Sequence, residues 1–255
     1  MSRSLNVHLL PAVFSPDVVA GGIVVMVDIL RASTTMTVAL ANGASGVVPC
    51  LHVDDAFALR DSKPNGKCLL GGERGGVKID GFDFGNSPRD YSPEVVAGKV
   101  LAFTTTNGTR ALHHSRQAAE ILIGCFLNLT SVVHYLQQQS TDIHIVCAGT
   151  NGEITSEDVL FGGCLADMLM SCSAENFQCS DSTRLAMDHW QAHCGDLQVE
   201  RLHQAIRGSQ GGKNLIVLGY DEDIRFVSQI DSVQALAKLS EDGTLRLVST
   251  AASHV

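Results

Sequence analysis

The chain has 255 residues, with 18 Lys and Arg against 27 Asp and Glu, and its formal net charge at pH 7 is −9. Hydrophobic residues make up 45% and charged residues 18%, a balance that excludes an intrinsically disordered chain. The acidic excess works against non-specific nucleic-acid binding, which needs a basic face. Eight cysteines without a CxxC pair favour a reducing compartment over a disulfide framework or a zinc site.

No segment predicts membrane insertion or secretion. The longest apolar run, residues 23–27, is far too short to span a bilayer. Residues 1–15 lack a long apolar core and an Ala-x-Ala site, so we expect no signal peptide. The sequence therefore predicts a cytoplasmic globular protein with no membrane or nucleic-acid partner. It leaves the oligomeric state open, a homo-oligomer included.

The first elements in chain order are short strands and apolar helices. Residues 5–10 predict a strand, and residues 23–29 (IVVMVDI) predict a central strand buried on both faces. An apolar helix follows and ends at Asn42-Gly43, a C-cap signal. Residues 46–50 then predict a strand and residues 53–60 a helix.

Periodicity disappears over residues 71–93, a long glycine-rich segment that we interpret as a functional loop. The alternation then resumes, with a polar helical region over 174–208 and short, mixed signals beyond residue 212. The predicted strands are residues 99–104, 120–124 and 142–148, and the predicted helices are residues 109–119, 129–139 and 156–173.

Strands that alternate with helices predict an α/β fold, with a largely parallel or mixed sheet flanked by helices. A break near residues 91–98 leaves two arrangements open. In one, residues 1–255 form a single domain. In the other, two similar α/β halves meet at a cleft.

Ligands of open α/β sheets bind beyond the carboxyl ends of the strands, and polar clusters follow several predicted strands. In the first cluster, Asp28 ends a buried strand and Arg31 can bind an anion. Ser33, Thr34 and Thr35 open the next helix, where free N–H groups favour phosphate. Helix capping explains the hydroxyls, but not the Asp and Arg beside them.

Three more segments carry polar groups of this kind. Residues 104–110 (TTTNGTR) predict a second anion-binding turn, built on Asn107, Gly108 and Thr109. Residues 147–153 precede Glu157 and Asp158, which by themselves fit a simple helix first turn. In the loop, residues 71–76 (GGERGG) place Glu73 and Arg74 among glycines that permit close backbone approach.

The inventory of these segments favours phosphoryl chemistry with a divalent metal. Carboxylates suit Mg²⁺, and arginines suit bidentate anion capture. The P-loop pattern and a GxGxxG turn after a strand are both absent. Cys68 and Arg74 match the bare C-x5-R spacing of cysteine phosphatases, but Glu73 would lie in the phosphate loop, so we interpret Cys68 as a buried strand thiol.

The ordered motifs DILRASTT (28–35), GERGG (72–76), GFDFGNSP (81–88), TTNGT (105–109) and CAG (147–149) with Glu157-Asp158 resemble the 2-phosphosulfolactate phosphatase family. The resemblance covers residues 23–223. It implies an α/β fold, Mg²⁺ as cofactor, and hydrolysis of 2-phospho-3-sulfolactate to 3-sulfolactate and phosphate in coenzyme M biosynthesis. Such a substrate carries phosphate, carboxylate and sulfonate groups, which agrees with more than one anion-binding turn.

This reading gives a site hypothesis. Asp28, Glu73 and Asp158 hold Mg²⁺ directly or through water, and Glu157 is the candidate general base. Arg31 with Ser33, Thr34 and Thr35 binds the phosphate. Arg74 with Asn107, Gly108 and Thr109 binds the sulfonate or carboxylate.

Several alternatives stay open. Asp28 can instead be a nucleophile that forms an aspartyl phosphate. The substrate can be another small phosphorylated acid. A metal-free phosphatase that depends on Cys68 and a non-catalytic anion-binding protein are the rival classes.

Overall fold

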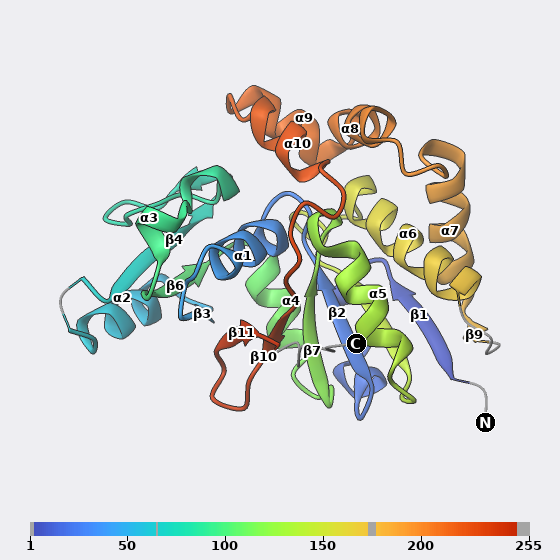
Figure 1. Cartoon of the computed structure of the whole chain (residues 1–255), viewed down its shortest axis with the longest axis horizontal. Helices are drawn as coiled ribbons and strands as arrows, with labels where there is room; N and C mark the ends of the chain where they lie inside the picture. Colours follow the sequence, from blue (N-terminus) through green and yellow to red (C-terminus); the bar gives the residue numbers. More distant parts are fainter. Residues whose placement is uncertain (1–2, 65, 173–176, 249–255) are drawn as a thin grey trace, which may run out of the picture.

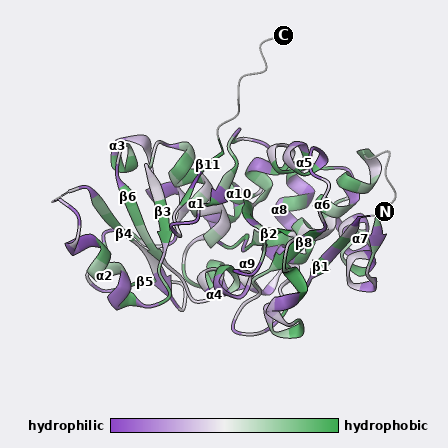
Figure 2. Cartoon of the chain, turned by 90° about the horizontal axis from the view of Figure 1, so that it is seen from below, coloured by the Kyte–Doolittle hydropathy of each residue, from purple (hydrophilic) through white to green (hydrophobic). Residues whose placement is uncertain are grey.

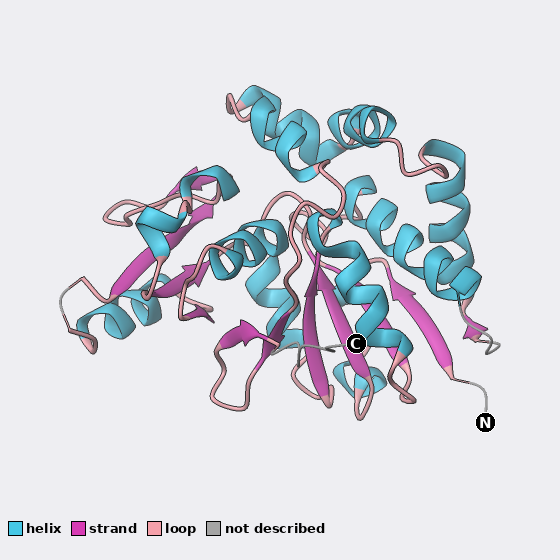
Figure 3. Cartoon of the chain, viewed as in Figure 1, coloured by secondary structure: helices cyan, strands magenta, loops and turns pink. Residues whose placement is uncertain are grey.

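The computed structural model describes residues 3–64, 66–172 and 177–248. Its helices and strands form one layered α/β arrangement (Figure 1, Figure 3). The strands are β1 (Ser4–His8), β2 (Ile23–Val27), β3 (Gly46–Pro49), β4 (Cys68–Arg74), β5 (Val77–Lys78), β6 (Val100–Thr104), β7 (Glu120–Gly124), β8 (Ile143–Cys147), β9 (Gln178–Cys179), β10 (Ala237–Leu239) and β11 (Leu245–Leu247). The helices are α1 (Ala32–Ala41), α2 (Val53–Asp61), α3 (Pro93–Val96), α4 (Gly108–His114), α5 (Leu129–Gln137), α6 (Ser156–Cys172), α7 (Asp181–His193), α8 (Val199–Gly208), α9 (Gln210–Val217) and α10 (Asp221–Val227).

The strands join one mixed sheet in the order β5-β4-β6-β3-β11-β10-β7-β2-β8-β1-β9. Two parallel groups lie within it: β4-β6-β3, and β7-β2-β8-β1-β9. The antiparallel hairpin β10–β11 connects the groups, because β11 pairs with β3 and β10 pairs with β7. The predicted α/β class is confirmed, and the sheet stays open rather than closing into a barrel.

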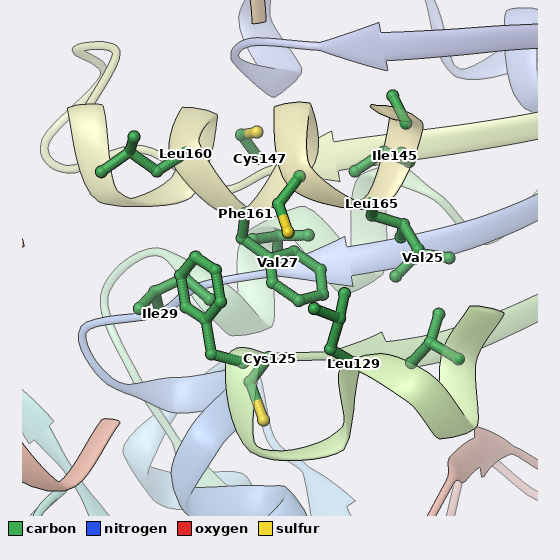
Figure 4. Packing of buried hydrophobic residues seen from close by; sticks show 14 of the residues in the cluster. Val25, Val27, Ile29, Cys125, Leu129, Ile145, Cys147, Leu160, Phe161 and Leu165 are labelled. Atoms are coloured by element: carbon green, nitrogen blue, oxygen red, sulfur yellow. The ribbon is translucent and has the colours of Figure 1, made fainter. Parts of the chain in front are cut away.

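The central strand β2 is buried on both faces because its side chains alternate between two apolar clusters. Val25 and Val27 pack with Phe161 of α6 and Leu129 of α5 in one cluster (Figure 4). Val24 and Met26 belong to the cluster that contains the α1 residues Met36, Ala39 and Leu40. Burial on both faces explains why this strand reads as a continuous apolar run.

Helix α4 packs on the same face as α1, and other helices lie at the edges and at one end of the sheet. At one edge, hydrophobic residues of β3, β4 and β6 pack with Ala56 and Phe57 of α2, a helix that carries both hydrophobic and hydrophilic residues (Figure 2). Helices α8, α9 and α10 lie together beyond the ends toward which β1 and β7 point (Figure 1). These three helices therefore face the end of the sheet where ligands of α/β proteins bind.

Most elements agree with the sequence predictions, and each predicted strand lies within two residues of the observed bounds. The predicted helix 109–119 is too long, because α4 ends at His114 and Ala119 N, directly before β7, donates to Gly22 O, directly before β2. The last residue of the predicted helix 156–173, and residues 174–176 of the predicted helical region, lie outside the described residues.

The long loop predicted over residues 71–93 is partly wrong. Strand β4 continues to Arg74 because Gly71 and Gly72 pair with Phe103 and Thr104 of β6. The sequence patterns beyond residue 212 are short and mixed, and they did not predict the hairpin β10–β11. The strands on both sides of residues 91–98 share one sheet, and a division into two subdomains there stays a prediction. No helix in the described part of the chain is both long and apolar enough to cross a membrane.

Candidate active site

A cavity of about 330 Å³ lies at the carboxyl ends of several strands, where the sheet meets α9. Segments that follow β2, β4, β6 and β8 all contribute to its wall, which brings together parts of the chain far apart in sequence. Its polar lining residues are Asp28, Arg31, Glu73, Asn86, Thr106, Asn107, Thr150, Asn151 and Asn214, and Leu215, Val217 and Leu218 of α9 and its end form an apolar rim.

Asp28 lies directly after β2 and is only 7% exposed. Its Oδ1 accepts a hydrogen bond from Ala32 N at 3.1 Å, which caps α1, and its Oδ2 accepts none from the described residues. Burial raises the pKa of Asp28 to about 7; the Ala32 N–H opposes this shift, and the charges of Glu73 and Glu157 add to it. A carboxyl group with such a pKa can accept or donate a proton near neutral pH.

Gly108 allows α4 to begin directly against this carboxyl group. A Cβ at position 108 would lie 2.8 Å from Asp28 Oδ2 and 2.7 Å from Ala32 Cβ. Only glycine fits such an approach without moving the helix. The predicted role of Gly108 in substrate binding stays a prediction, and its evident role is to bring the 105–109 turn next to Asp28.

Arg31 is 2% exposed and is fixed by contacts from two distant segments, α10 with its N-cap residue and the turn after β4. Its Nη1 donates to Asp223 Oδ2 of α10 at 2.7 Å, and its Nη2 donates to Gly76 O at 3.1 Å. The guanidinium carbon lies 4.2 Å from the centre of the Tyr220 ring. Arg31 is therefore held rigidly at the cavity wall, with its remaining N–H groups free for an anion.

Glu73 and Arg74 are neighbours in β4, yet their side chains line different cavities. The Glu73 carboxylate accepts hydrogen bonds from Gly76 N at 2.7 Å and Thr106 N at 2.8 Å, and it lines the cavity. The Arg74 side chain instead donates to Thr104 Oγ1 and lines a separate hollow. Successive strand residues point to opposite faces, which explains the split. The predicted contact of Arg74 with substrate is not supported by this placement.

Glu157 and Asp158 lie behind the cavity wall rather than in it. Asp158 accepts hydrogen bonds from Ile29 N at 2.8 Å and Gly149 N at 3.0 Å, so it ties together the ends of β2 and β8. Burial raises its pKa well above the usual range, and the charges of Glu157 and Asp28 add to the effect. Glu157 is 1% exposed, its Oε2 lacks a hydrogen-bond partner, and burial raises its pKa.

The N–H groups predicted to bind phosphate at the start of α1 make internal contacts, because Ser33 N donates to Asp28 O and Thr35 N donates to Arg31 O. The hydroxyls of these residues and of Thr109 also donate to backbone carbonyls, and none of the four residues lines the cavity. Of the predicted turn at 107–109, Asn107 alone lines it. The hydroxyl contacts are Ser33 to Asp28 O, Thr34 to Ile29 O, Thr35 to Asn86 O and Thr109 to Thr105 O. Their assignment to substrate stays a prediction without support from the geometry.

Sequence reasoning missed the contribution of the C-terminal helices. Asp223 is fully buried and bonds both Arg31 and Ser87, the latter through its Oδ1 at 2.7 Å. In the sequence it closes an acidic run that looks like an ordinary helix first turn. Asn86 lines the cavity with a buried Oδ1 that has no partner, and its GFDFGNSP motif was the one available signal for it.

The carboxylates suit a hydrated cation better than a closed metal site. Among the described residues, no group of three or more His, Cys, Asp or Glu side chains can hold a metal ion. Mg²⁺ usually keeps several waters and binds one or two carboxylates together with substrate phosphate. Asp28 Oδ2 and the unpartnered Asn86 Oδ1 are oxygen acceptors that fit this mode. That Asp28, Glu73 and Asp158 hold Mg²⁺ stays a prediction. The arrangement favours contacts between these carboxylates and the ion through bound water.

Cys68 is a buried thiol of β4, as interpreted from the sequence. It packs in the apolar cluster with Cys50, Leu70 and Phe82, away from the lining of the cavity. Burial raises its pKa, which lowers its thiolate fraction. A nucleophilic Cys68 is therefore disfavoured.

Comparison with known proteins agrees with this picture. A family model described as 2-phosphosulpholactate phosphatase matches residues 9–242. A probable 2-phosphosulfolactate phosphatase of Caldanaerobacter subterraneus is 37% identical over 223 residues, which are 88% of this chain and 89% of that protein. A protein of the same description from Symbiobacterium thermophilum is 36% identical over 222 residues, 87% of this chain and 93% of that protein. A third, from Thermotoga petrophila, is 37% identical over 216 residues, 84% of this chain and 88% of that protein.

Proposed function

The chain belongs to the 2-phosphosulfolactate phosphatase family, and on that premise we propose that it hydrolyses 2-phospho-3-sulfolactate to 3-sulfolactate and inorganic phosphate with the help of Mg²⁺. Members of this family are phosphoric monoester hydrolases. The coenzyme M pathway and a cytoplasmic location are part of the proposal.

The observation that carries the proposal is the charge of the cavity. Asp28 and Glu73 line it, and its one arginine, Arg31, is already paired with Asp223. A substrate with phosphate, carboxylate and sulfonate groups would be repelled by such a wall unless a cation lay between them. When bound near Asp28 and Glu73, Mg²⁺ would neutralise phosphate charge and orient the attacking water.

The remaining chemistry falls to the fixed groups around the cavity. Arg31 offers its remaining N–H groups to an anionic oxygen. Its bonds to Asp223 and to Gly76 O, and the bond from Ser87 to Asp223, hold the guanidinium in place. Asn107 and Asn86 supply further polar contacts. Glu157 as general base stays a prediction; its charge supports the raised pKa of Asp28.

Asp28 can act in two ways. As a base, it accepts a proton from the attacking water while the bond between phosphorus and the sulfolactate oxygen breaks. As a nucleophile, its carboxylate oxygen attacks phosphorus while the bond between phosphorus and the sulfolactate oxygen breaks, and that oxygen takes a proton from solvent. Water then hydrolyses the aspartyl phosphate to inorganic phosphate and the free carboxylate. Trapping of a phosphorylated Asp28 during turnover would select the second route.

The test is release of inorganic phosphate from 2-phospho-3-sulfolactate by the purified protein, with Mg²⁺ and with EDTA. We expect release that depends on Mg²⁺, and slower release from 2-phospholactate, which lacks the sulfonate. Phosphate release that persists in EDTA would contradict the proposed requirement for Mg²⁺. No release in Mg²⁺ would contradict the substrate and favour another phosphorylated acid or an anion-binding role.

A further inference from the structure

A second hollow, of about 420 Å³, is lined by Leu51, His52, Arg74, Arg110, His113 and His114. We call it the basic hollow. It shares no lining residue with the cavity and has no Asp or Glu in its lining. Only Leu51 is apolar, so the hollow suits a polar, negatively charged ligand rather than an apolar one.

Its two arginines lack acidic partners. None of the ion pairs among the described residues includes Arg74 or Arg110, although the chain as a whole has a net charge of −9. Both side chains are exposed. Two cationic side chains that line one hollow raise its local positive potential, which favours a bound anion.

Arg74 is also held in place for such a contact. Its Nη1 donates to Glu73 O at 2.8 Å and its Nη2 donates to Thr104 Oγ1 at 2.9 Å. These bonds fix the plane of the guanidinium and leave its other N–H groups free. A fixed, planar set of donors is the arrangement that recognises phosphate oxygens in pairs.

The other polar lining residues come from α4, which also carries Arg110, and from the residue that precedes α2. His113 and His114 are the last residues of α4, and the His114 ring is positioned by a 3.0 Å contact of its Nε2 with Phe14 O. His52 is the N-cap residue of α2. The Nε2–H of His114 is used by Phe14 O, so His52 and His113 are the imidazoles that can add N–H donors to those of the arginines.

We propose that the basic hollow is a second anion site, separate from the cavity, that binds a small phosphate-bearing molecule. Its volume lies within the range of roughly 300–1,000 Å³ that is usual for small-molecule sites. The proposal does not depend on the substrate of the cavity. It assigns Arg74 to this second site instead of to the sulfonate.

The test is isothermal titration calorimetry of the full chain in EDTA, with inorganic phosphate and with methyl phosphate as probes. Arg110→Gln and Arg74→Gln should each lower phosphate affinity by about tenfold or more, because each removes a charge-assisted contact. Arg184→Gln, which changes an exposed arginine paired with Asp181 on α7, should leave the affinity unchanged.

The outcomes separate clearly. Weaker binding of both probes in the two hollow variants supports the site and points to a phosphorylated metabolite, while weaker binding of inorganic phosphate alone points to the free ion. Unchanged affinity in both hollow variants, or no heat from either probe with the wild-type chain, would overturn the proposal. Phosphate-induced shifts of the His113 and His114 side-chain resonances in NMR spectra give an independent check, and their absence would also count against it.

Discussion

The cavity and the basic hollow have opposite charge, although consecutive residues of one strand serve them. Glu73 faces the cavity, where Asp28 adds a second carboxylate and Arg31 is neutralised by Asp223. Arg74 faces the basic hollow, where Arg110 adds a second unpaired cation. An acidic cavity can take an anionic substrate only together with a cation, whereas the basic hollow can take an anion directly. This difference predicts that anion binding in the basic hollow is independent of hydrolysis in the cavity.

The largest expected effect comes from Asp28. Asp28→Asn keeps an acceptor for the Ala32 N–H but removes the charge and the basic oxygen, so turnover should fall by about 10³-fold or more. The measurement is phosphate release at saturating substrate, with circular dichroism to confirm folding. Asp61→Asn, on the exposed end of α2, is the control. Near-normal turnover of Asp28→Asn would contradict both mechanisms.

Asp223 tests whether the C-terminal helices hold the cavity in shape. Asp223→Asn removes the charge that pairs with buried Arg31, so the free energy of unfolding should fall by about 3 kcal/mol. Because Arg31 is then less well fixed, KM should rise by about tenfold, with a smaller change in kcat. Denaturant titration and steady-state kinetics measure the two effects.

Asp221→Asn is the natural control for that experiment. Asp221 lies on the same helix, and its ion pair with Arg207 is half exposed. Its loss should change the free energy of unfolding by less than about 0.5 kcal/mol. Equal effects of the two variants would show that Asp223 has no special role in positioning Arg31.

A smaller effect is expected at the histidines beside the basic hollow. His114 packs on Phe14, Phe14 packs on His8, and His8 Nε2 lies 3.0 Å from His144 Nδ1. Burial lowers the pKa of His8 to about 4, and His144 and His114 add to the shift. The folded state therefore favours neutral His8. Its contribution to stability is complete above the unfolded pKa of about 6.5 and is lost as the pH falls from there to about 4.

His8→Gln should remove this pH dependence. Between pH 6.5 and 4 the free energy of unfolding of the variant should fall by about 2 kcal/mol less than that of the wild-type chain. Denaturant titrations at several pH values measure the difference. His134→Gln, at an exposed position of α5, is the comparison. Parallel pH profiles for wild type and His8→Gln would rule out a neutral, buried His8 as the cause.

Local patterns were enough to predict the centre of the fold and part of the cavity. The apolar run of β2 marked a strand buried on both faces, and its position placed Asp28 at a carboxyl end. Glu73 was found because a charged residue among glycines is unusual. These inferences depend on neighbours in the chain, which a single sequence displays directly.

The features that the sequence did not reveal depend on contacts between distant residues and on the direction in which a strand's side chains point. The bond between Arg31 and Asp223 joins residues 192 positions apart, and nothing local distinguishes Asp223 from its acidic neighbours. The strands β10 and β11 are three residues each and owe their form to pairing with β7 and β3. The predicted contact of Arg74 with substrate took no account of strand direction, because the loop prediction hid the strand β4 that sets where its side chain points.

The separation of the two sites is tested most directly by changing the two neighbours in β4. Phosphate release from 2-phospho-3-sulfolactate in Mg²⁺ is measured for Glu73→Gln, Arg74→Gln and the wild-type chain. We predict that Glu73→Gln lowers kcat/KM by about tenfold or more, while Arg74→Gln changes it by less than about threefold. Equal losses in the two variants, or a larger loss in Arg74→Gln, would contradict the assignment of Glu73 to the cavity and Arg74 to a separate anion site.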